Sequence, residues 1–355
     1  MKMKVFFIII ILTISTSFVS LRTIYNEVKQ NKTEMEISKI ESSQINTNNE
    51  VEHTNMVPSE LFVEESKIKR SKLNYSYKDD LNVEADLSNF TLSLSFGQCG
   101  INDIFSIKKI ELVGVENQIA IESCTDWVGP YTVKYIGTEK NTNKEIFTGG
   151  WHGSNGDVTG NATAFTKMIA IYADGKEIKK KTNGEADIIS IVLKNEIKGF
   201  NINDYVIEET VTYTIYENQV DIKVQIVAIH DLEILRYYGL QTQNNMFDNE
   251  IKYLYEDGRS ITKSLGMASD SGVKNSENKV ISFELSGITH QFLLKAWINS
   301  DGLLSSFNYI AADKAEAFTT YYGKSYFNLI NGNTLVLKAG ENLVWSGGYS
   351  FKLAD

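Results

Sequence analysis

The sequence predicts an all-β protein: a large antiparallel β-sandwich of the jelly-roll or supersandwich-like kind, preceded by an N-terminal signal or anchor and a flexible spacer. From about residue 86 onward, apolar and polar residues alternate with a period of two, which is the pattern of half-buried strands. Turn-forming pairs such as Asp257-Gly258 and Asn331-Gly332 separate the short runs. No amphipathic helix longer than about ten residues interrupts them, so we expect the strands to pack as a sandwich.

Residues 1–22 have the composition of a signal peptide or signal anchor. Lys2 and Lys4 make the start basic, and an apolar run follows from Val5 to Leu21. A basic start before such a run is an export signal, and this run is just long enough to remain in a bilayer. Cleavage and retention stay open. In either case we expect an extracellular or cell-surface protein that meets a membrane only through this segment.

Residues 23–75 are predicted to form a polar flexible spacer, and residues 76–355 the β-sandwich domain. The spacer is rich in Glu, Lys, Asn, Ser and Thr and has no sustained apolar period. Such a stretch buries too little apolar surface to offset the entropy lost on folding. A flexible spacer of this length has a root-mean-square span of roughly 40 Å, which suits a tether.

Within the folded part, the clearest element is an antiparallel hairpin predicted over Val211–Ala228. Its apolar residues alternate with polar ones on both sides of a turn at Glu217-Asn218. Further short strands are predicted at Thr91–Phe96, Ile107–Val113, Gln118–Ser123, Thr132–Ile136, Met168–Tyr172, Phe292–Ile298, Thr319–Tyr322, Thr334–Leu337 and Asn342–Ser346. This many strands fit two long sheets better than one immunoglobulin-sized unit.

Cys99 and Cys124 are the two cysteines of the chain, and each ends an apparent strand. If the strands are neighbours and the protein is exported, the two thiols can pair as a disulfide. The alternative is a pair of buried thiols, and the sequence does not decide between them.

The composition excludes several classes of function. The net charge is −10, and a nucleic-acid partner requires a concentrated basic surface, so we expect none. The chain has no G-x-S-x-G elbow, no glycine-rich phosphate loop ending in Lys-Ser/Thr and no His-Glu-x-x-His motif. With four histidines and two cysteines it offers little for zinc or haem, so neither a metal nor a cofactor is predicted.

The most unusual segment is Phe147–Asn161, with the sequence FTGGWHGSNGDVTGN. Its glycines let the backbone turn sharply and approach a ligand closely. Trp151, as a stacking platform for a sugar ring, and Asp157 are candidate ligand-binding residues. His152 is a candidate for hydrogen bonding or, in an enzyme, for proton transfer. The alternative is a connection whose tryptophan fills the core and whose histidine binds backbone carbonyls.

Arg236 is the second candidate, because residues 76–355 contain only two arginines. Arginine binds planar carboxylates bidentately, which lysine cannot do; the alternative is an ordinary ion pair within the protein. The segment from Arg236 to Gln241 is predicted to lie on a strand that continues from the hairpin. Alternation places Arg236 and Tyr238 on one face, with Tyr237 and Gln241 on the other. Gln241 is a ligand-binding candidate, and Tyr238 is a catalytic candidate only if the protein is an enzyme.

An aromatic and basic group near residue 322 completes the candidates. Tyr322 and Lys324 stand close to further tyrosines in the string YYGKSY. Such a group could line a groove, although aromatic residues of strands usually serve in packing. We therefore take Tyr322 and Lys324 as ligand-binding candidates.

Five strings in three regions of the chain are similar to parts of a known module. They are DWVGPY, FTGGWHG and YADG within residues 126–175, RYYGLQ at residues 236–241, and YGKSY at residues 322–326. Together they resemble a β-sandwich module of Bacillus-type surface proteins and phage tail proteins, often found beside SGNH-type esterases. The resemblance implies a glycan-facing setting. The Gly-Asp-Ser block and the Asp-x-x-His ending of an SGNH esterase are absent, so it does not imply esterase activity.

Two functions follow, with a third as the plain alternative. The first is a tethered β-sandwich that recognises cell-wall or capsular polysaccharide, with Arg236 selecting acidic sugars. The second is a polysaccharide lyase or hydrolase acting on acidic glycans, in which His152 or Tyr238 moves the proton and Arg236 neutralises a uronate carboxylate. The third is a structural surface protein without a site. Convergence of His152, Arg236 and Tyr238 on one groove would favour the first two.

Overall fold

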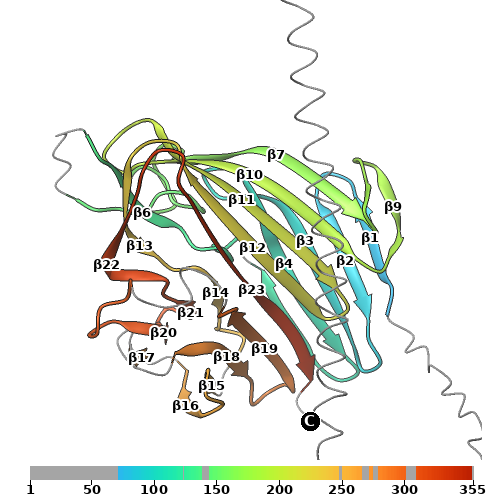
Figure 1. Ribbon diagram of the computed structural model, residues 1–355. Coiled ribbons are helices and arrows are strands. Elements are labelled where there is room, and N and C mark those ends of the chain that lie inside the picture. The colour runs from blue at the N-terminus through green and yellow to red at the C-terminus, as the bar shows by residue number, and fades with distance from the viewer. Residues whose placement is uncertain are drawn as a thin grey trace, which may run out of the picture. The chain divides into compact units, whose positions relative to one another are not determined.

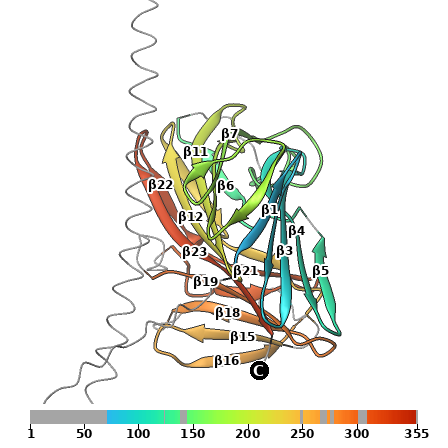
Figure 2. The same cartoon turned by 90° about the vertical axis from the view of Figure 1, so that its right-hand side faces the viewer.

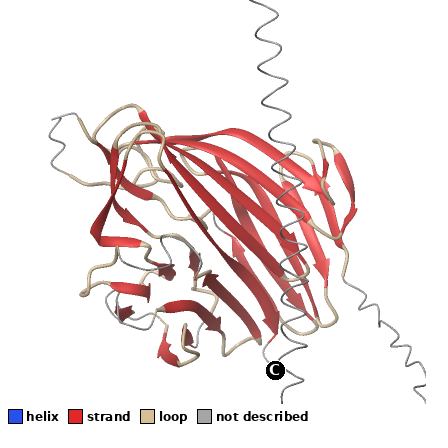
Figure 3. Cartoon of the chain, viewed as in Figure 1, coloured by secondary structure: helices blue, strands red, loops and turns tan. Residues whose placement is uncertain are grey.

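A computed structural model describes residues 71–122, 124–137, 144–247, 250–265, 272–274, 279–300 and 309–353. Strands and the turns that join them make up these residues, which confirms the predicted all-β class (Figures 1 and 3). The expected signal or anchor and the spacer up to residue 70 lie outside the described residues. Within the described ranges no helix is long and apolar enough to cross a membrane. Residues 69–355 form one compact unit.

The first large sheet has six strands, all paired antiparallel. They are β1 (Leu73–Tyr77), β2 (Leu81–Asp86), β3 (Phe90–Cys99), β4 (Ile104–Gly114), β5 (Gln118–Glu122) and β9 (Thr182–Ala186). Their order in the sheet is β5-β4-β3-β2-β1-β9. Apolar residues alternate with polar ones along β2, where Leu81, Val83 and Ala85 are buried, so one face of the sheet is directed inward.

The second large sheet has ten strands. They are β7 (Ala164–Ala173), β8 (Lys176–Glu177), β10 (Ile189–Lys198), β11 (Tyr205–Tyr216), β12 (Gln219–Ala228), β15 (Glu250–Tyr255), β16 (Ser260–Ser264), β18 (Val280–Ser286), β19 (Phe292–Ile298) and β23 (Asn342–Leu353). Their order is β16-β15-β18-β19-β23-β12-β11-β10-β7-β8. The predicted hairpin corresponds to β11 and β12, and β23 joins the two halves of the sheet by pairing with β12 and β19.

The core lies between these two sheets. Figure 2 shows strands β1, β3, β4 and β5 of the six-stranded sheet, in blue and cyan, beside strands β7, β11 and β12 of the ten-stranded sheet. Phe96 of β3 meets Tyr213 of β11 edge-to-face at 5.4 Å between ring centres, and Phe90 meets Phe292 of β19 at 5.9 Å. Edge-to-face contacts of this kind add to the burial of apolar surface. Leu81 is fully buried, and its replacement by alanine should cost about 2–5 kcal/mol.

Two smaller sheets carry the candidate site. The three-stranded sheet has the order β22-β13-β6, with β6 (Tyr131–Tyr135), β13 (Leu232–Tyr237) and β22 (Ile330–Leu337). The four-stranded sheet has the order β14-β21-β20-β17, with β14 (Gln241–Gln243), β17 (Val273–Lys274), β20 (Ala315–Thr319) and β21 (Lys324–Phe327).

The sheets begin earlier in the chain than the alternation predicted. β1 starts at Leu73, inside the stretch assigned to the spacer, and β2 starts at Leu81. β1 pairs with both β2 and β9. The signal was present in Leu81-Asn82-Val83-Glu84-Ala85, but a strand this short and rich in Asn and Glu has weak intrinsic preference for the extended state. The hydrogen bonds that β1 forms with β2 on one edge and with β9 on the other stabilise these strands in spite of their weak intrinsic preference.

Two predicted strands are wrong in detail. The strand expected over Thr319–Tyr322 is a turn from residue 320 to residue 323, closed by the bond from Gly323 N to Thr320 O at 3.1 Å. Gly323 has φ +84°, a left-handed conformation that glycine adopts without strain. The strand expected from Arg236 to Gln241 breaks after Tyr237, because Gly239 with φ +69° redirects the chain before β14.

Candidate functional site

The glycine-rich loop between β6 and β7 folds as a tight turn around Trp151. The amide of His152 donates to the carbonyl of Gly149 at 3.0 Å. Gly150 has φ +51°, and a Cβ on it would lie 1.9 Å from Asp126 Oδ1. Any larger residue at position 150 would therefore displace the Asp126 carboxylate, so the glycine is required by close approach as well as by conformation.

Asp126 joins this loop to the segment that follows β5. Its carboxylate is buried, with 1 % of its side chain exposed. Oδ1 accepts a hydrogen bond from the amide of Trp151 at 2.7 Å, and Oδ2 lies 3.1 Å from His152 Nε2. The other ring nitrogen of His152, Nδ1, lies 3.0 Å from the carbonyl oxygen of Gly156. Since both partners of the imidazole are acceptors, the ring is best satisfied when both nitrogens carry protons.

The pKa of His152 follows from this environment. Burial of the ring lowers the pKa, but the hydrogen bond to Asp126, the charge of Asp126 and the Gly156 carbonyl raise it, and the net direction is upward. His152 is therefore an imidazolium donor over a wider pH range than a free histidine. In the imidazolium form neither nitrogen offers a lone pair, so in that form His152 does not supply a general base.

Asn102 holds the same loop from the opposite side. Its side chain is buried in the turn between β3 and β4. Nδ2 donates to the carbonyls of Gly150 and His152 at 2.8 and 3.0 Å, and Oδ1 accepts from the amides of Thr163 and Ala164 at 2.7 and 3.1 Å. All four hydrogen-bonding positions of this amide are thus used on the start and the end of one loop.

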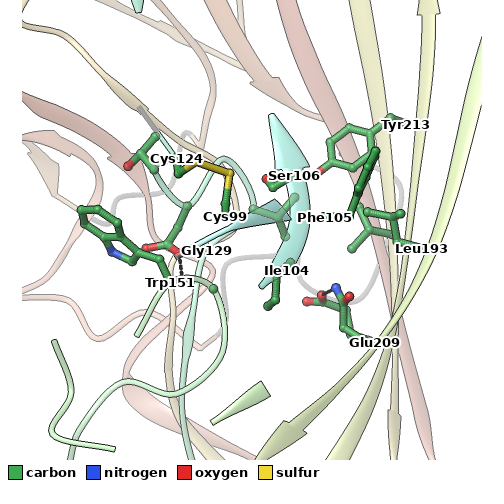
Figure 4. Close-up of a pocket in the computed structure, with 16 residues that line it drawn as sticks. Cys99, Ile104, Phe105, Ser106, Cys124, Gly129, Trp151, Leu193, Glu209 and Tyr213 are labelled. Atoms are coloured by element: carbon green, nitrogen blue, oxygen red, sulfur yellow. Dashed lines mark hydrogen bonds between the residues drawn. A yellow bond between two sulfur atoms is a disulfide. The ribbon is translucent and has the colours of Figure 1, made fainter. Parts of the chain in front are cut away.

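A disulfide connects the two segments that hold the loop. Cys99 pairs with Cys124, with 5.3 Å between their Cα atoms, which settles the open alternative in favour of the disulfide. Cys99 precedes Asn102 by three residues, and Cys124 precedes Asp126 by two. Figure 4 shows the bond beside Trp151. A Cβ at Gly100 would lie 2.6 Å from that of Trp151, so this backbone supports the tryptophan directly.

Four further side chains surround the loop and bring Arg236 to it. The ring of Phe147 lies 5.4 Å from that of His152 and 5.2 Å from that of Tyr238, and Arg236 Cζ lies 5.6 Å from its centre. The rings of Tyr238 and Tyr326 are 5.0 Å apart. Phe147 is therefore the common contact of the loop and β13, within the range of aromatic and cation–π interactions.

The turn between β20 and β21 completes the arrangement. Lys324 Nζ lies 4.8 Å from the centre of the Trp151 ring, and the hydroxyl of Tyr322 lies 3.1 Å from that of Tyr326. The aromatic–cationic cluster is named here as Phe147, Trp151, His152, Arg236, Tyr238, Tyr322, Lys324 and Tyr326. Its residues come from three separate parts of the sequence.

The cluster carries more positive than negative charge. His152, Lys324 and Arg236 are cationic, and Asp126 is the buried counter-charge on His152. Burial lowers the pKa of Lys324, while the charge of Asp126 acts in the opposite direction. Arg236 forms no ion pair with any carboxylate among the described residues. The alternative role of Arg236, an ion pair within the protein, is therefore not found among these residues.

The exposed aromatic surface of the cluster belongs to the turn and not to Trp151. Trp151 is half-buried, and the Lys324 ammonium lies over its ring. Tyr322 is 58 % exposed, and its neighbour Tyr321, whose ring lies 5.3 Å away, is 81 % exposed. Among these rings the two tyrosines are the exposed ones, whereas the Trp151 ring is in cation–π contact with Lys324.

Six predicted residues meet in the cluster, and two do not. Asp157 is exposed on the loop, where its carboxylate accepts from the amide of Val158 at 2.8 Å. Gln241 is 2 % exposed, and its Nε2 lies 3.5 Å from Thr125 Oγ1. Gln241 was predicted on the assumption of an unbroken strand, and the turn at Gly239 buries it instead.

Several residues of the site escaped prediction. Asp126, Asn102 and Tyr326 are polar or aromatic residues in ordinary contexts, and their role arises from contacts across the fold. Phe147 stood at the start of the glycine-rich segment but carried no chemical signal of its own. Burial raises the pKa of Tyr238, an effect that Arg236 only partly opposes, so this phenol is poorly suited to act as a base.

A small cavity lies beside Trp151 and the disulfide. Its volume is about 30 Å³, and its lining includes Asp126, Trp151, Asn195 and Glu209 (Figure 4). This volume suits one or two ordered waters and not a sugar. Trp151 Nε1 is buried without a hydrogen-bond partner in the described part of the chain, and a water in the cavity would supply one. No group of three His, Cys, Asp or Glu residues among those described could hold a metal ion.

Comparison with known proteins gives only distant similarities. No family model and no curated protein matches the chain. The GH36 α-galactosidase AgaA from Geobacillus stearothermophilus, solved with raffinose, is 10% identical with a TM-score of 0.40; the match covers 80% of this chain and 41% of the galactosidase. Galactose 1-epimerase from Lactobacillus acidophilus is 12% identical with a TM-score of 0.38, covering 81% and 99% of the two chains.

A putative mutarotase from Salmonella typhimurium is similar to the same extent, at 6% identity and a TM-score of 0.36, over 78% of this chain and 91% of the mutarotase. All three are carbohydrate-active proteins. The similarity is too low to transfer a site, and the chain spans less than half of the galactosidase. The function is therefore argued from the cluster itself.

Proposed function

We propose that this protein binds acidic polysaccharide at the aromatic–cationic cluster, and that it does so outside the cell, on a surface to which its N-terminus tethers it. The observation that carries the proposal is Arg236, a guanidinium without a carboxylate partner among the described residues, held against Phe147. The exposed Tyr322 is linked to this pair through Tyr326 and Tyr238. A uronate carboxylate would provide the bidentate partner that this guanidinium lacks.

The charges of the cluster favour an anionic ligand. The whole chain has a net charge of −10, so it has no general attraction for polyanions. His152 and Lys324 add two further cationic groups to Arg236 within the cluster. Sugar rings would stack on Tyr322 and Tyr321, whose apolar faces are exposed.

The enzymatic alternative has less support from the geometry. A lyase needs a base near the sugar, and both nitrogens of His152 face acceptors. The raised pKa of Tyr238 also works against a phenolate. Binding requires only the positioned charges and rings that the cluster has.

Affinity electrophoresis and calorimetry with polygalacturonate, alginate and hyaluronan test the proposal, with neutral dextran for comparison. We expect binding to the acidic glycans that weakens with salt and falls about tenfold or more in Arg236→Lys and Tyr322→Ala, since each removes a contact worth at least about 1.4 kcal/mol. Arg259→Ala is the matched control, because Arg259 is paired with Asp257 on an exposed turn. Equal loss in the Arg259 variant, or no binding to any acidic glycan, would overturn the proposal.

A further inference from the structure

The outer face of the six-stranded sheet is hollowed into a groove. The inner face of this sheet is buried against the core, and the groove on the other side has a volume of about 630 Å³. Residues of β1, β2, β3, β4 and β9 line it. This face is separate from the aromatic–cationic cluster, none of whose residues belongs to the groove.

Pairing of the strands arranges the polar residues of the groove in two rows that cross the sheet. The first row is Asn183, Ser76, Asn82, Ser95 and Lys109, and the second is Glu185, Asn74, Glu84, Ser93 and Glu111. Neighbours within a row are separated by the strand spacing of about 4.8 Å, and the rows lie about 6.7 Å apart along the strands. The groove is thus a regular grid of amide, hydroxyl and carboxylate groups.

The amides of this grid are not used by the fold. Asn74, Asn82 and Asn183 are exposed, and no side-chain hydrogen bond joins them to another residue in the ranges described. Asparagine is disfavoured in strands, yet it occupies these positions on three neighbouring strands. The outer face of the ten-stranded sheet differs, because there Lys194 pairs with Glu208 and Lys167 pairs with Glu196.

The charges of the groove decide the class of ligand. Lys109 is already paired with Glu111 and Glu122 at 3.2 and 3.0 Å. Glu84, which accepts a hydrogen bond from the Ser93 hydroxyl at 3.4 Å through one oxygen, and Glu185 are carboxylates that repel an anion but accept hydrogen bonds from hydroxyl groups. The outward-facing positions of the two rows hold no aromatic ring. A ligand here would therefore be bound by many hydrogen bonds to the amide, hydroxyl and carboxylate groups of the rows.

We propose that this groove binds a linear glycan without acidic groups, lying across the strands. The hydroxyls of successive sugar rings would pair with the amides of Asn183, Asn82 and Asn74 and with the carboxylate of Glu84, each amide serving as donor and acceptor. A chain running along the rows meets one strand after another at near-regular intervals. Binding without stacking is weak, of about millimolar order, and a tethered protein compensates by engaging many copies at one surface.

Saturation-transfer NMR of the whole protein with cellohexaose and with mannohexaose tests this inference. We expect saturation transfer to the sugar protons of at least one hexasaccharide, and about a tenfold loss of affinity in the Asn82→Ala, Asn183→Ala double variant. Thr212→Ala on the outer face of the ten-stranded sheet is the matched control and should leave the signal unchanged.

A Tyr322→Ala variant separates the groove from the aromatic–cationic cluster. Transfer that persists in Tyr322→Ala but falls in the asparagine variant supports a second site, whether or not acidic glycans bind at the cluster. An oligolysine peptide is the cationic comparison for the carboxylates of the groove. The inference would be overturned if saturation transfer is absent for both hexasaccharides, if it survives the double variant, or if it appears only with this peptide.

Discussion

His152 Nε2 lies 3.1 Å from Asp126 Oδ2, while Nδ1 of the same ring lies 3.0 Å from the carbonyl of Gly156. The imidazole is therefore held between a charged and a neutral acceptor. This makes the protonated ring a structural part of the loop, and it ties the order of the loop to pH.

The first prediction concerns that pH dependence. The pKa of His152 is raised in the folded protein, so the stabilisation is complete below the unfolded value of about 6.5 and is lost as the pH rises through the folded value. Thermal unfolding from about pH 6 to pH 9 should show this decline. Asp126→Asn removes the carboxylate, and we expect it to cost about 1.5–3 kcal/mol and to move the decline to lower pH.

His230→Gln serves as the control for this prediction, since His230 is partly exposed at the rim and lies 3.8 Å from Asp204. It should leave the pH profile in place. A profile that is identical in Asp126→Asn and in the unaltered protein would show that the pair does not contribute.

The second prediction concerns Lys324. Burial lowers its pKa, so the ammonium loses its proton at a lower pH than an ordinary lysine does. Binding of polygalacturonate should therefore weaken on the alkaline side before free lysines titrate, and Lys324→Arg should keep its affinity there because arginine stays charged. Calorimetry at increasing alkaline pH measures the affinity for polygalacturonate, and Lys338→Arg, at an exposed ion pair, is the control. Parallel pH profiles for the Lys324→Arg variant and the parent would contradict it.

The third prediction concerns Asn102. Asn102→Ala removes the side-chain partner of the Gly150 carbonyl and of the Thr163 and Ala164 amides, whereas the His152 carbonyl keeps the Thr163 hydroxyl as a donor. We expect a loss of about 2–4 kcal/mol in unfolding free energy. Asn102→Asp keeps the acceptor but sets a carboxylate oxygen against the carbonyls of Gly150 and His152, so it should be no better than alanine. Urea unfolding with tryptophan fluorescence measures both, and full stability in the aspartate variant would count against the four-bond arrangement.

The fourth prediction concerns the disulfide. Cys99 and Cys124 are 25 residues apart, and closing a loop of this length stabilises the folded state by about 3.5 kcal/mol in the chain-entropy account. The Cys99→Ser, Cys124→Ser variant should unfold at lower temperature and bind polygalacturonate more weakly, because Asn102 and Asp126 lose their connection. Dithiothreitol should reproduce both effects in the parent. Weaker binding without any change in unfolding temperature, or neither effect, would show that the bond does not act in this way.

The fifth prediction concerns Glu209, a buried carboxyl of β11. Burial raises its pKa, against hydrogen bonds from Tyr131 at 2.6 Å and Asn195 at 2.8 Å. The folded state thus holds the proton more tightly, and stability declines as the pH rises from about 4.3 through the raised value. Glu209→Gln should flatten this decline and stabilise the protein at neutral pH. Glu233→Gln, at a half-buried carboxylate paired with Lys134, is the control.

The fold was predictable where one face of a strand is dry and the other wet. The alternation in Val211–Ala228 places each residue on its observed face of β11 and β12. Thr319–Tyr322 has the β-branched and aromatic composition of a strand, yet the left-handed Gly323 and the bond to Thr320 make it a turn. Intrinsic preference was overridden there by the pairing of β20 with β21.

The site was predictable only in its unusual residues. Trp151, His152 and Arg236 stood out by rarity, and they do come together through Phe147. Asp126 and Asn102 did not, because their partners lie 25 and 48 or more residues away and are chosen by the packing of the sheets. The missing Arg236 ion pair is likewise a property of the assembled fold.

The position of β23 has a consequence for how the protein is made. This strand, residues 342–353, is inserted between β12 and β19. The facing edges of β12 and β19 therefore stay unpaired until β23 has been synthesised. The two halves of the ten-stranded sheet cannot be joined during translation of the preceding residues, and each exposes unpaired backbone until synthesis reaches this point. A nascent chain stalled before residue 342 should bind chaperones, whereas one extended past residue 353 and clear of the exit tunnel should be released.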